Sequence, residues 1–397
     1  MNPRVRPLDA RWIRHQGEQT LLLQDRQGFL PGPMLAPPAV AVLLSLCDGT
    51  RDIDTLATAY RLRTGEPATP QDIQRIIDEL DEALVFESPR FLEALAEQLA
   101  AYRAAPHRDP FHAGAVYPER VDDLLDRIAA WRPDVPAQED LTVSAVISPH
   151  IDYARGGPVY GATWRAATAA ARAADYDSSS APILRRLTGC NFTRHGYPRT
   201  PFGIRRARRR SSPPARAIGE GDFTEEIHHR TEHSIELAAV WLHWAIEGRS
   251  TPIVPILCGS FAPYTDGERD PAADRNFAAV LDALHTALDG KRVLAVAAAD
   301  LAHVGPAFGD GPFREAEQAN LRQHDERTLA TIQTGDAAGF FGDLRAERDA
   351  RKYCGLPPIY LTLRYLEQSQ GEVIQYDQCP ADDEKTSWVS IAGALLR

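Results

Sequence analysis

Hydrophobic and polar residues alternate along the first part of the chain in patterns typical of a hairpin and three helices. Residues 19–29 have the pattern of a short hairpin, and residues 37–50 that of an apolar helix. Two amphipathic helices are predicted next, one over residues 52–64 that begins on an Asp cap and one that begins at Thr69. The apolar residues on one face of the second helix are Ile73, Ile76, Ile77, Leu80 and Leu84. Residues 1–88 are therefore predicted to form a small α+β unit.

The end of this unit, LVFES, is predicted to be a closing strand. A pair of helices followed by a strand is similar to a winged-helix arrangement. The segments LLSLCDGTRDIDTLA and LDEALVFES also resemble PqqD-type peptide-recognition domains, which accompany radical-SAM enzymes. A generic helical adaptor is the alternative interpretation. DNA binding is disfavoured because the second helix carries acidic residues that repel phosphate, namely Asp72, Asp78, Glu79, Asp81 and Glu82.

Beyond this unit, the pattern changes from clustered helices to alternating strands and helices. Residues 89–110 are predicted to be a polar helix and linker, and residues 111–397 a second domain. Its apolar, strand-like runs are 143–148, 250–257 and 291–299, and its helical stretches include 121–131, 235–247 and 276–290. This alternation predicts an α/β fold, in which a central, mostly parallel sheet is flanked by helices on both faces.

Length, charge and cysteine content narrow the class of protein. A chain of 397 residues is too long for one ordinary core, which agrees with two domains. The net charge of −11 argues against binding to nucleic acids or membrane surfaces. No apolar run is long enough for a transmembrane helix, and the N-terminus lacks the apolar region of a signal peptide. Five scattered cysteines do not suggest a disulfide framework, so we expect a cytoplasmic protein.

Three segments each leave a polar side chain at the end of an apolar strand. The first ends on His150, the second carries Asp300 and His303, and the third presents Cys354. Ligands of open α/β sheets bind beyond the carboxyl ends of the strands, so these residues are expected to meet in one crevice. Two histidines, a carboxylate and a thiol in one crevice indicate a transition-metal or redox site.

Six segments of the second domain resemble, in order and spacing, the conserved blocks of the Memo family. They are HAGAVYP (112–118), SPHIDYARGGPVYG (148–161), EHSIEL (232–237), IVPILCG (253–259), AADLAHVG (298–305) and CGLPPI (354–359). In bacteria and archaea this family is protein B of the AmmeMemoRadiSam system. The resemblance therefore implies an AMMECR1-like protein and a radical-SAM protein as partners, and the PqqD-like segment suits that setting.

The Memo fold is similar to that of class III extradiol dioxygenases, which hold a non-haem metal. By resemblance, we expect a metal-binding, redox-linked protein with iron or copper as cofactor and a peptide as candidate substrate. His150, His303 and Cys354 are the implied metal ligands, and Asp300, Glu232 and His233 the implied catalytic residues. The alternative function is a non-catalytic adaptor module that binds a peptide or small molecule.

Each of these residues also has a purely structural interpretation, which the sequence leaves open. His150 and Cys354 are interpreted either as ligands or as a hydrogen-bonded histidine and a buried, inert cysteine. Asp300 either orients His303 or binds metal itself. Glu232 and His233 either cap the following helix or act as acid and base. The glycines before Pro158 are expected to let the backbone approach a ligand.

One segment departs from the family pattern. The family has a strand ending in G-[ST]-x-H between the second and third blocks, but residues 178–219 lack that motif. They contain ten arginines and no acidic residue, in a chain that is acidic overall. We interpret the segment either as a frameshifted or degenerate translation, which would remove a central strand, or as a genuine basic insertion for an anionic partner.

Overall fold

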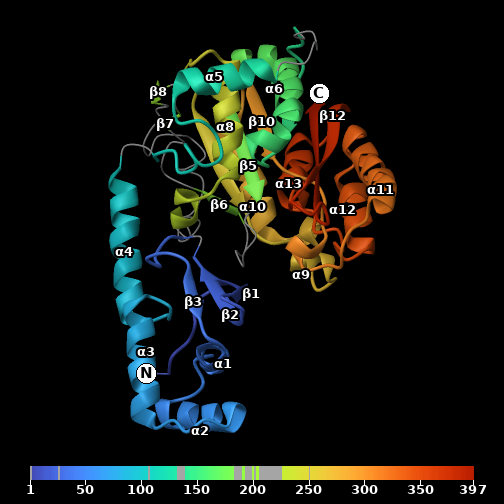
Figure 1. The fold of residues 1–397 in the computed structure, drawn as a ribbon. Coiled ribbons are helices and arrows are strands. Elements are labelled where there is room, and N and C mark those ends of the chain that lie inside the picture. The colour runs from blue at the N-terminus through green and yellow to red at the C-terminus, as the bar shows by residue number, and fades with distance from the viewer. Residues whose placement is uncertain are drawn as a thin grey trace. The chain divides into compact units, whose positions relative to one another are not determined.

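A computed structural model describes the chain as two compact units, Met1–Ala104 and Ala105–Arg397. The described residues are 2–25, 27–105, 108–131, 139–182, 190–192, 199–200, 203–204, 226–249 and 251–397. Helix α4 (Pro89–Ala104), predicted as part of a linker, belongs to the first unit (Figure 1). Its Phe91 packs edge-on against Phe29, with ring centroids 5.2 Å apart, and thus contributes to the core of that unit.

The first unit begins with a three-stranded antiparallel sheet in the order β1-β2-β3. The strands are β1 (Asp9–His15), β2 (Glu18–Gln24) and β3 (Met34–Ala36). The residues predicted as a hairpin, 19–29, contain most of β2 and the start of its connection to β3, with which β2 pairs antiparallel. A second, tighter hairpin joins β1 to β2 through Gln16 and Gly17. Both turn residues have positive φ, at 52° and 88°, which suits a two-residue hairpin loop.

Three helices follow the sheet, close to their predicted positions. They are α1 (Pro38–Leu46), α2 (Ile53–Thr64) and α3 (Pro70–Glu82). Asp52 caps α2 and Thr69 caps α3, as predicted from the sequence. The predicted closing strand is reduced to a single bridge between Val5 and Phe86, because the chain leaves α3 at Leu84 with a φ of 61°. The winged-helix arrangement, which depended on that strand, stays a prediction.

The second unit is built on an eight-stranded mixed sheet in the order β11-β13-β4-β10-β5-β9-β6, with β12 paired to β13. Its centre is parallel and consists of β4 (Ala145–Ser148), β10 (Val293–Ala298), β5 (Tyr176–Pro182) and β9 (Ile253–Cys258). Its flanks are antiparallel and consist of β6 (Cys190–Phe192), β11 (His303–Val304), β12 (Gly371–Pro380) and β13 (Trp388–Leu396). The α/β class is thus correct, whereas the sheet is mixed rather than mostly parallel. Strands β7 (Arg199–Thr200) and β8 (Gly203–Ile204) form a separate pair.

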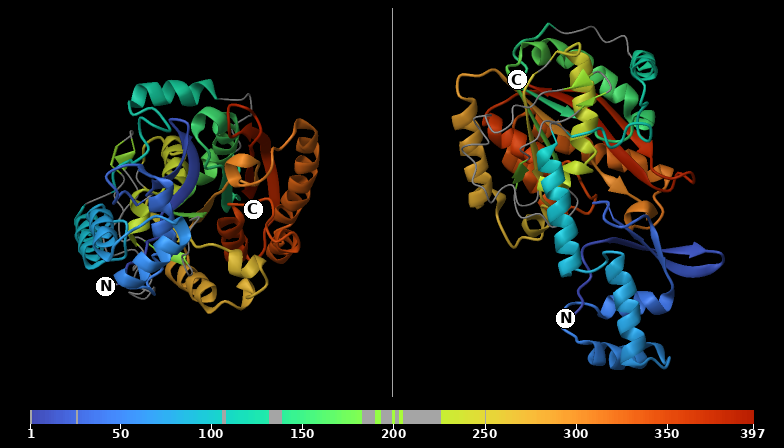
Figure 2. Two further views of the ribbon diagram at one scale, coloured as in Figure 1. Left: turned by 60° about the horizontal axis from the view of Figure 1, so that its bottom comes forward. Right: turned by 90° about the vertical axis from the view of Figure 1, so that its left-hand side faces the viewer.

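Helices cover both faces of this sheet (Figures 1 and 2). One face packs against α5 (Val121–Ala130), α6 (Tyr153–Ala173) and α8 (Ser234–Ala245). The other packs against α10 (Arg275–Leu288), α11 (Glu315–Gln333), α12 (Ala337–Ala346) and α13 (Leu356–Leu366). A short helix α9 (Ala262–Thr265) follows β9, and 3₁₀ segments include η2 (Glu226–Arg230), η3 (Pro271–Ala273) and η4 (Pro306–Phe308).

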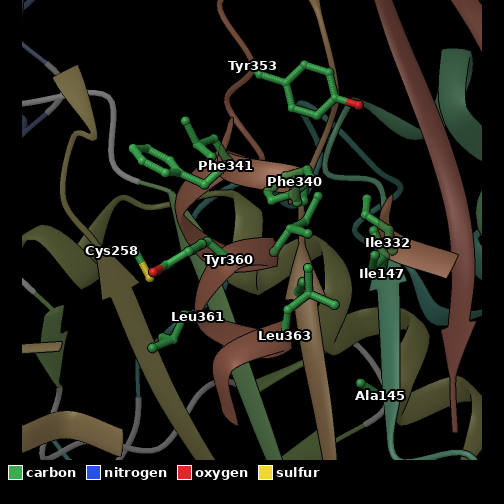
Figure 3. Packing of buried hydrophobic residues seen from close by; sticks show 14 of the residues in the cluster. Ala145, Ile147, Cys258, Ile332, Phe340, Phe341, Tyr353, Tyr360, Leu361 and Leu363 are labelled. Atoms are coloured by element: carbon green, nitrogen blue, oxygen red, sulfur yellow. The ribbon is translucent and has the colours of Figure 1, made fainter. Parts of the chain in front are cut away.

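Side chains of β4, β9 and β10 alternate between the two helical layers. In β4, Ala145 and Ile147 face the α10–α13 layer, and Val146 faces the α5–α8 layer. Figure 3 shows the hydrophobic core between the sheet and the α10–α13 layer, where Tyr360 and Leu363 of α13 lie near the strands. Burial on both faces explains why these strands appear in the sequence as nearly continuous apolar runs.

The frameshift interpretation of residues 178–219 carried the expectation that a central strand is lost, but a strand begins just before this segment and extends into it. Tyr176–Pro182 forms β5, which pairs in parallel with β10 on one side and β9 on the other. The expectation failed because a sheet ladder is made by backbone groups, which the small, polar stretch Ser178–Ser180 supplies as well as an apolar run does. Most of the arginines of segment 178–219 lie outside the described residues. The frameshift and insertion interpretations of this segment concern mainly those residues.

Candidate functional site

The candidate site begins where two neighbouring parallel strands end. Ser148 of β4 pairs with Ala298 of β10, so the residues that follow each strand lie side by side. The Oδ1 atom of Asp300 accepts hydrogen bonds from the backbone N–H groups of His150 (2.8 Å) and Ile151 (3.1 Å). Its Oδ2 atom lies 3.6 Å from Nε2 of His150. Asp300 therefore fixes the loop that carries His150, a role that the sequence analysis did not assign to it.

The imidazole of His150 has a defined orientation. Its Nδ1 lies 3.0 Å from the carbonyl oxygen of Ala298. Because a carbonyl oxygen can only accept, Nδ1 carries the proton and Nε2 is left with a lone pair. That lone pair faces Cys354, whose Sγ lies 3.2 Å away. Both side chains are buried, so His150 and Cys354 form a desolvated imidazole–thiol pair.

Glycine at position 355 is what allows Cys354 to reach this pair. The N–H of Gly355 donates to the carbonyl oxygen of Asp300 at 2.9 Å. A Cβ atom at this position would lie 2.4 Å from the same oxygen, so no larger residue fits without displacing the loop. Burial, followed by the nearby Asp300 carboxylate, raises the pKa of the Cys354 thiol well above its usual range. The raised pKa favours the protonated thiol, which donates to the carbonyl oxygen of Asp300 at 3.6 Å and lies 3.2 Å from Nε2 of His150.

His303 lies on the same side of the sheet but is held by the main chain. Its backbone N–H donates to the carbonyl oxygen of Arg351 at 2.7 Å, and its Nδ1 lies 3.1 Å from the carbonyl oxygen of Leu301. Burial, and then the neighbouring His150, lowers the pKa of His303, while Asp300 opposes the shift. The ring packs edge-on against Phe308, with centroids 5.0 Å apart. His303 thus belongs to the electrostatic environment of the pair, and its ring contacts the backbone of Leu301 and Lys352 and the ring of Phe308.

Glu232 and His233 lie at the start of α8, beside the pair. The ring of His233 is 5.2 Å from that of His150 and 5.9 Å from that of His112, measured between centroids. Glu232 accepts from the backbone N–H (2.8 Å) and hydroxyl of Ser234, which agrees with a role in capping the helix. Burial acts to raise the pKa of Glu232, but His233 and Ser234 hold it well below its usual range. Glu232 is therefore ionised.

Two residues that the sequence analysis did not single out hold this region in place. The Glu236 carboxylate accepts from Arg108, from the backbone N–H groups of residues 111 and 112, and from the Tyr117 hydroxyl. Arg108 also donates to three main-chain carbonyl groups, those of His229, Arg230 and Glu232. Both charged side chains are almost fully buried. The position of Glu236 within EHSIEL was the only sequence signal for this ion pair.

The glycines before Pro158 have a different role from the one predicted. They lie in the first turns of α6, whose N-terminus is capped by Asp152. A Cβ atom at Gly156 would lie 2.5 Å from Ile151, and one at Gly157 would lie 2.3 Å from Trp131. These glycines allow close packing of the helix against its neighbours rather than the approach of a ligand.

The fit of a metal ion depends on how many donors converge. Throughout the described ranges, no group of three or more His, Cys, Asp or Glu side chains is arranged to hold a metal ion. His150 and Cys354 converge as a pair, with Asp300 close to His150. The donor chemistry of the pair suits a soft or borderline metal, since it combines an imidazole nitrogen with a sulfur.

Comparison with known proteins gives one consistent result. The family model described as Memo-like protein matches residues 108–395. The chain is 25% identical to a MEMO1 family protein of Aquifex aeolicus over 416 aligned positions, which cover all of both chains. It is 24% identical to the protein memo-1 homolog of Caenorhabditis elegans, over 66% of this chain and 71% of the relative. Within the described residues, no helix is long and apolar enough to cross a membrane.

Proposed function

The chain belongs to the Memo-like protein family, and we propose that it is a metal-binding, redox-linked member in which His150 and Cys354 bind iron or copper. One observation carries the proposal. The Nε2 atom of His150 lies 3.2 Å from Sγ of Cys354, while the other ring nitrogen is held by the carbonyl oxygen of Ala298. A histidine whose second nitrogen donates to a carbonyl group is the usual form of a metal-binding histidine.

The spacing of the donors also supports metal binding. Metal–nitrogen and metal–sulfur bonds of about 2.0–2.3 Å at tetrahedral angles separate neighbouring donors by roughly 3.3–3.8 Å. The observed separations are 3.2 Å from His150 to Cys354 and 3.6 Å from His150 to Asp300. His303 is the third ligand in this proposal, and its Nδ1 is held by a carbonyl oxygen in the same way as that of His150. When bound, iron or copper would supply one-electron redox chemistry.

The remaining residues of the site have supporting roles in the proposal. Asp300 orients His150 through the backbone of the loop. Metal binding requires loss of the Cys354 proton, because thiolate is the binding form. His233 is the nearest ionisable group toward solvent, since 41% of its side chain is exposed and its ring packs against that of His150. We assign it, together with Glu232, to proton exchange between the site and water.

The wider setting is proposed from the family resemblance. We extend the proposal to dioxygenase-like chemistry and to action alongside an AMMECR1-like protein and a radical-SAM protein on a peptide substrate, in the cytoplasm. The first unit would then act as a PqqD-like, winged-helix-type domain that binds the peptide. The full-length match to the Aquifex aeolicus relative supports a function in which both units take part.

Elemental analysis of the purified protein, after incubation with Fe(II) or with Cu(I) under reducing conditions, tests the proposal. The wild type is expected to retain stoichiometric metal, and the double variant His150→Ala/Cys354→Ala to lose it. Cys47→Ala is the matched control, because Cys47 is a buried cysteine of the first unit. A folded wild type that retains no more metal than the double variant would refute metal binding.

A second candidate function is a non-catalytic module that binds a peptide or small molecule. The observation in its favour is that the described residues present two converging donors rather than three. In that case, metal would not change ligand binding, and His150→Ala would weaken it no more than the loss of local packing requires.

A further inference from the structure

A buried carboxylate lies behind the loop that carries His303. Asp325 of α11 is fully buried, and none of its contacts is with His150, Cys354 or His303 themselves. Its Oδ1 accepts from Arg351 at 2.7 Å, and its Oδ2 accepts from the Tyr376 hydroxyl at 2.8 Å. The hydroxyl of Ser390 is a third donor to this carboxylate.

Two of these three partners reach the backbone next to His303, each from a different side. The Ser390 hydroxyl accepts the N–H of Ala302 at 3.0 Å. The carbonyl oxygen of Arg351 accepts the N–H of His303 at 2.7 Å. The N–H of His303 belongs to the peptide group just before its Cα atom, and the N–H of Ala302 belongs to the preceding peptide group. Both are therefore linked to Asp325 through one intermediate residue. Tyr376, the third partner, lies on β12, and its hydroxyl donates to Asp325 and accepts from the side chain of Gln378.

The geometry points to Asp325 as a positioning residue that holds the backbone of the loop and thereby sets the orientation of the His303 side chain. This inference rests on the proposed function, because it gives His303 a place among the ligands. A buried carboxylate is costly unless all its partners are satisfied, so such a group favours one arrangement of the surrounding loops. Residues behind a ligand that fix its orientation typically change metal affinity by about 10–100-fold when they are replaced.

The test compares Asp325→Asn with Tyr376→Phe in the full chain. Both variants weaken the network, but Tyr376→Phe leaves the links through Ser390 and Arg351 in place. The readout is the ¹⁵N spectrum of the imidazole groups in metal-free, ¹⁵N-histidine-labelled protein, with the His303 signals assigned by a His303→Gln variant. Asp325→Asn is expected to shift the His303 signals and change the tautomer ratio, whereas Tyr376→Phe leaves them unchanged. An unchanged His303 in Asp325→Asn, despite a lower unfolding midpoint, would overturn the inference.

Two further measurements keep the inference testable and separate it from the proposed function. If Asp325→Asn does not fold, Ser390→Ala breaks only the link to Ala302, and His303 signals that stay unchanged would again overturn the inference. If the wild type binds Cu(I) or Fe(II), Asp325→Asn is expected to weaken that binding 10–100-fold and Tyr376→Phe less than threefold. Equal metal affinities of Asp325→Asn and the wild type would contradict the role of Asp325 in positioning His303. A wild type that binds no metal refutes the proposed function, and the metal-free spectrum still decides the role of Asp325.

Discussion

The buried ion pair between Arg108 and Glu236 gives the sharpest prediction about stability. Replacing Glu236 with Ala removes an acceptor that serves Arg108, the Tyr117 hydroxyl (2.6 Å) and the backbone N–H groups of Phe111 (3.0 Å) and His112 (2.9 Å). The relative exposure of the two charged side chains is 1% for Arg108 and 0% for Glu236. Water therefore cannot replace the lost carboxylate without a change in the surrounding structure.

The expected loss of stability in Glu236→Ala follows from the buried donors that lose their acceptor. Breaking a buried ion pair by removing one partner costs about 3–5 kcal/mol, because the other charge stays buried without compensation. Arg108 keeps three main-chain acceptors, which lowers this cost, whereas the Tyr117 hydroxyl and two N–H groups lose theirs. Because a buried unsatisfied donor costs about 1–3 kcal/mol and such losses are not additive, we expect Glu236→Ala to lower the free energy of unfolding by about 4 kcal/mol. Glu236→Gln keeps the shape and one acceptor oxygen, and should lose about half as much.

The assay is urea unfolding followed by far-ultraviolet circular dichroism. The control is Glu247→Ala, because Glu247 pairs with Arg172 in an ion pair whose side chains are 68% and 42% exposed. Exposed pairs contribute about 0–1 kcal/mol, so this variant should unfold almost like the wild type. The reasoning is refuted if Glu236→Ala loses no more stability than Glu247→Ala at an unchanged denaturant slope.

Three further predictions concern single residues. Gly355→Ala should displace the Cys354 loop and lower the thermal unfolding midpoint, because its Cβ would lie 2.4 Å from a backbone oxygen. Gly342→Ala is the control, since Gly342 faces open space on α12, and it should stabilise the protein by about 0.5–1 kcal/mol. Equal changes in the unfolding midpoint of the two variants would contradict this prediction. Burial raises the pKa of Asp349 to about 6, so the folded state binds its proton more tightly than the unfolded state, and the free energy of unfolding should rise as pH falls from about 6 to 4. Asp349→Asn should remove this rise in urea titrations at several pH values, and an identical pH dependence in the variant would disprove the assignment. Thr69→Ala should lower the stability of the first unit by about 1 kcal/mol through loss of the α3 cap, whereas Thr58→Ala, within α2, should have little effect when both are measured by hydrogen exchange.

The meeting of His150 and Asp300 could be foreseen because it follows from simple rules. His150 and Asp300 end apolar runs, and parallel strands place their carboxyl ends at one edge of the sheet. Cys354 was also expected at the end of a strand, but it lies in the turn before α13, so the strand rule was wrong for this residue and only the resemblance of its block to the Memo family placed it. Its position depends on the close approach of Gly355 to Asp300, which no local pattern encodes.

Other features could not be predicted, because they depend on contacts between distant segments. Nothing near Arg108 indicates that its partner is Glu236, 128 residues further along the chain. The same holds for Asp325, which appears in the sequence as one more acidic residue of a polar helix. Strand β5 escaped detection because periodicity reports side chains, whereas its place in the sheet is set by backbone pairing with β10 and β9.

The insertion of β10 between β4 and β5 has a consequence for how the protein is made. The hydrogen bond from His150 to Asp300 joins residues 150 positions apart, so the candidate site cannot form until the ribosome has synthesised almost the whole second unit. Until then, β4 and β5 each lack a neighbour, and their backbone edges remain open to pairing with other chains. Folding of a sheet with such distant pairings is slow and prone to aggregation. We therefore expect nascent chains that stall before residue 293 to depend on chaperones and to be removed by proteolysis.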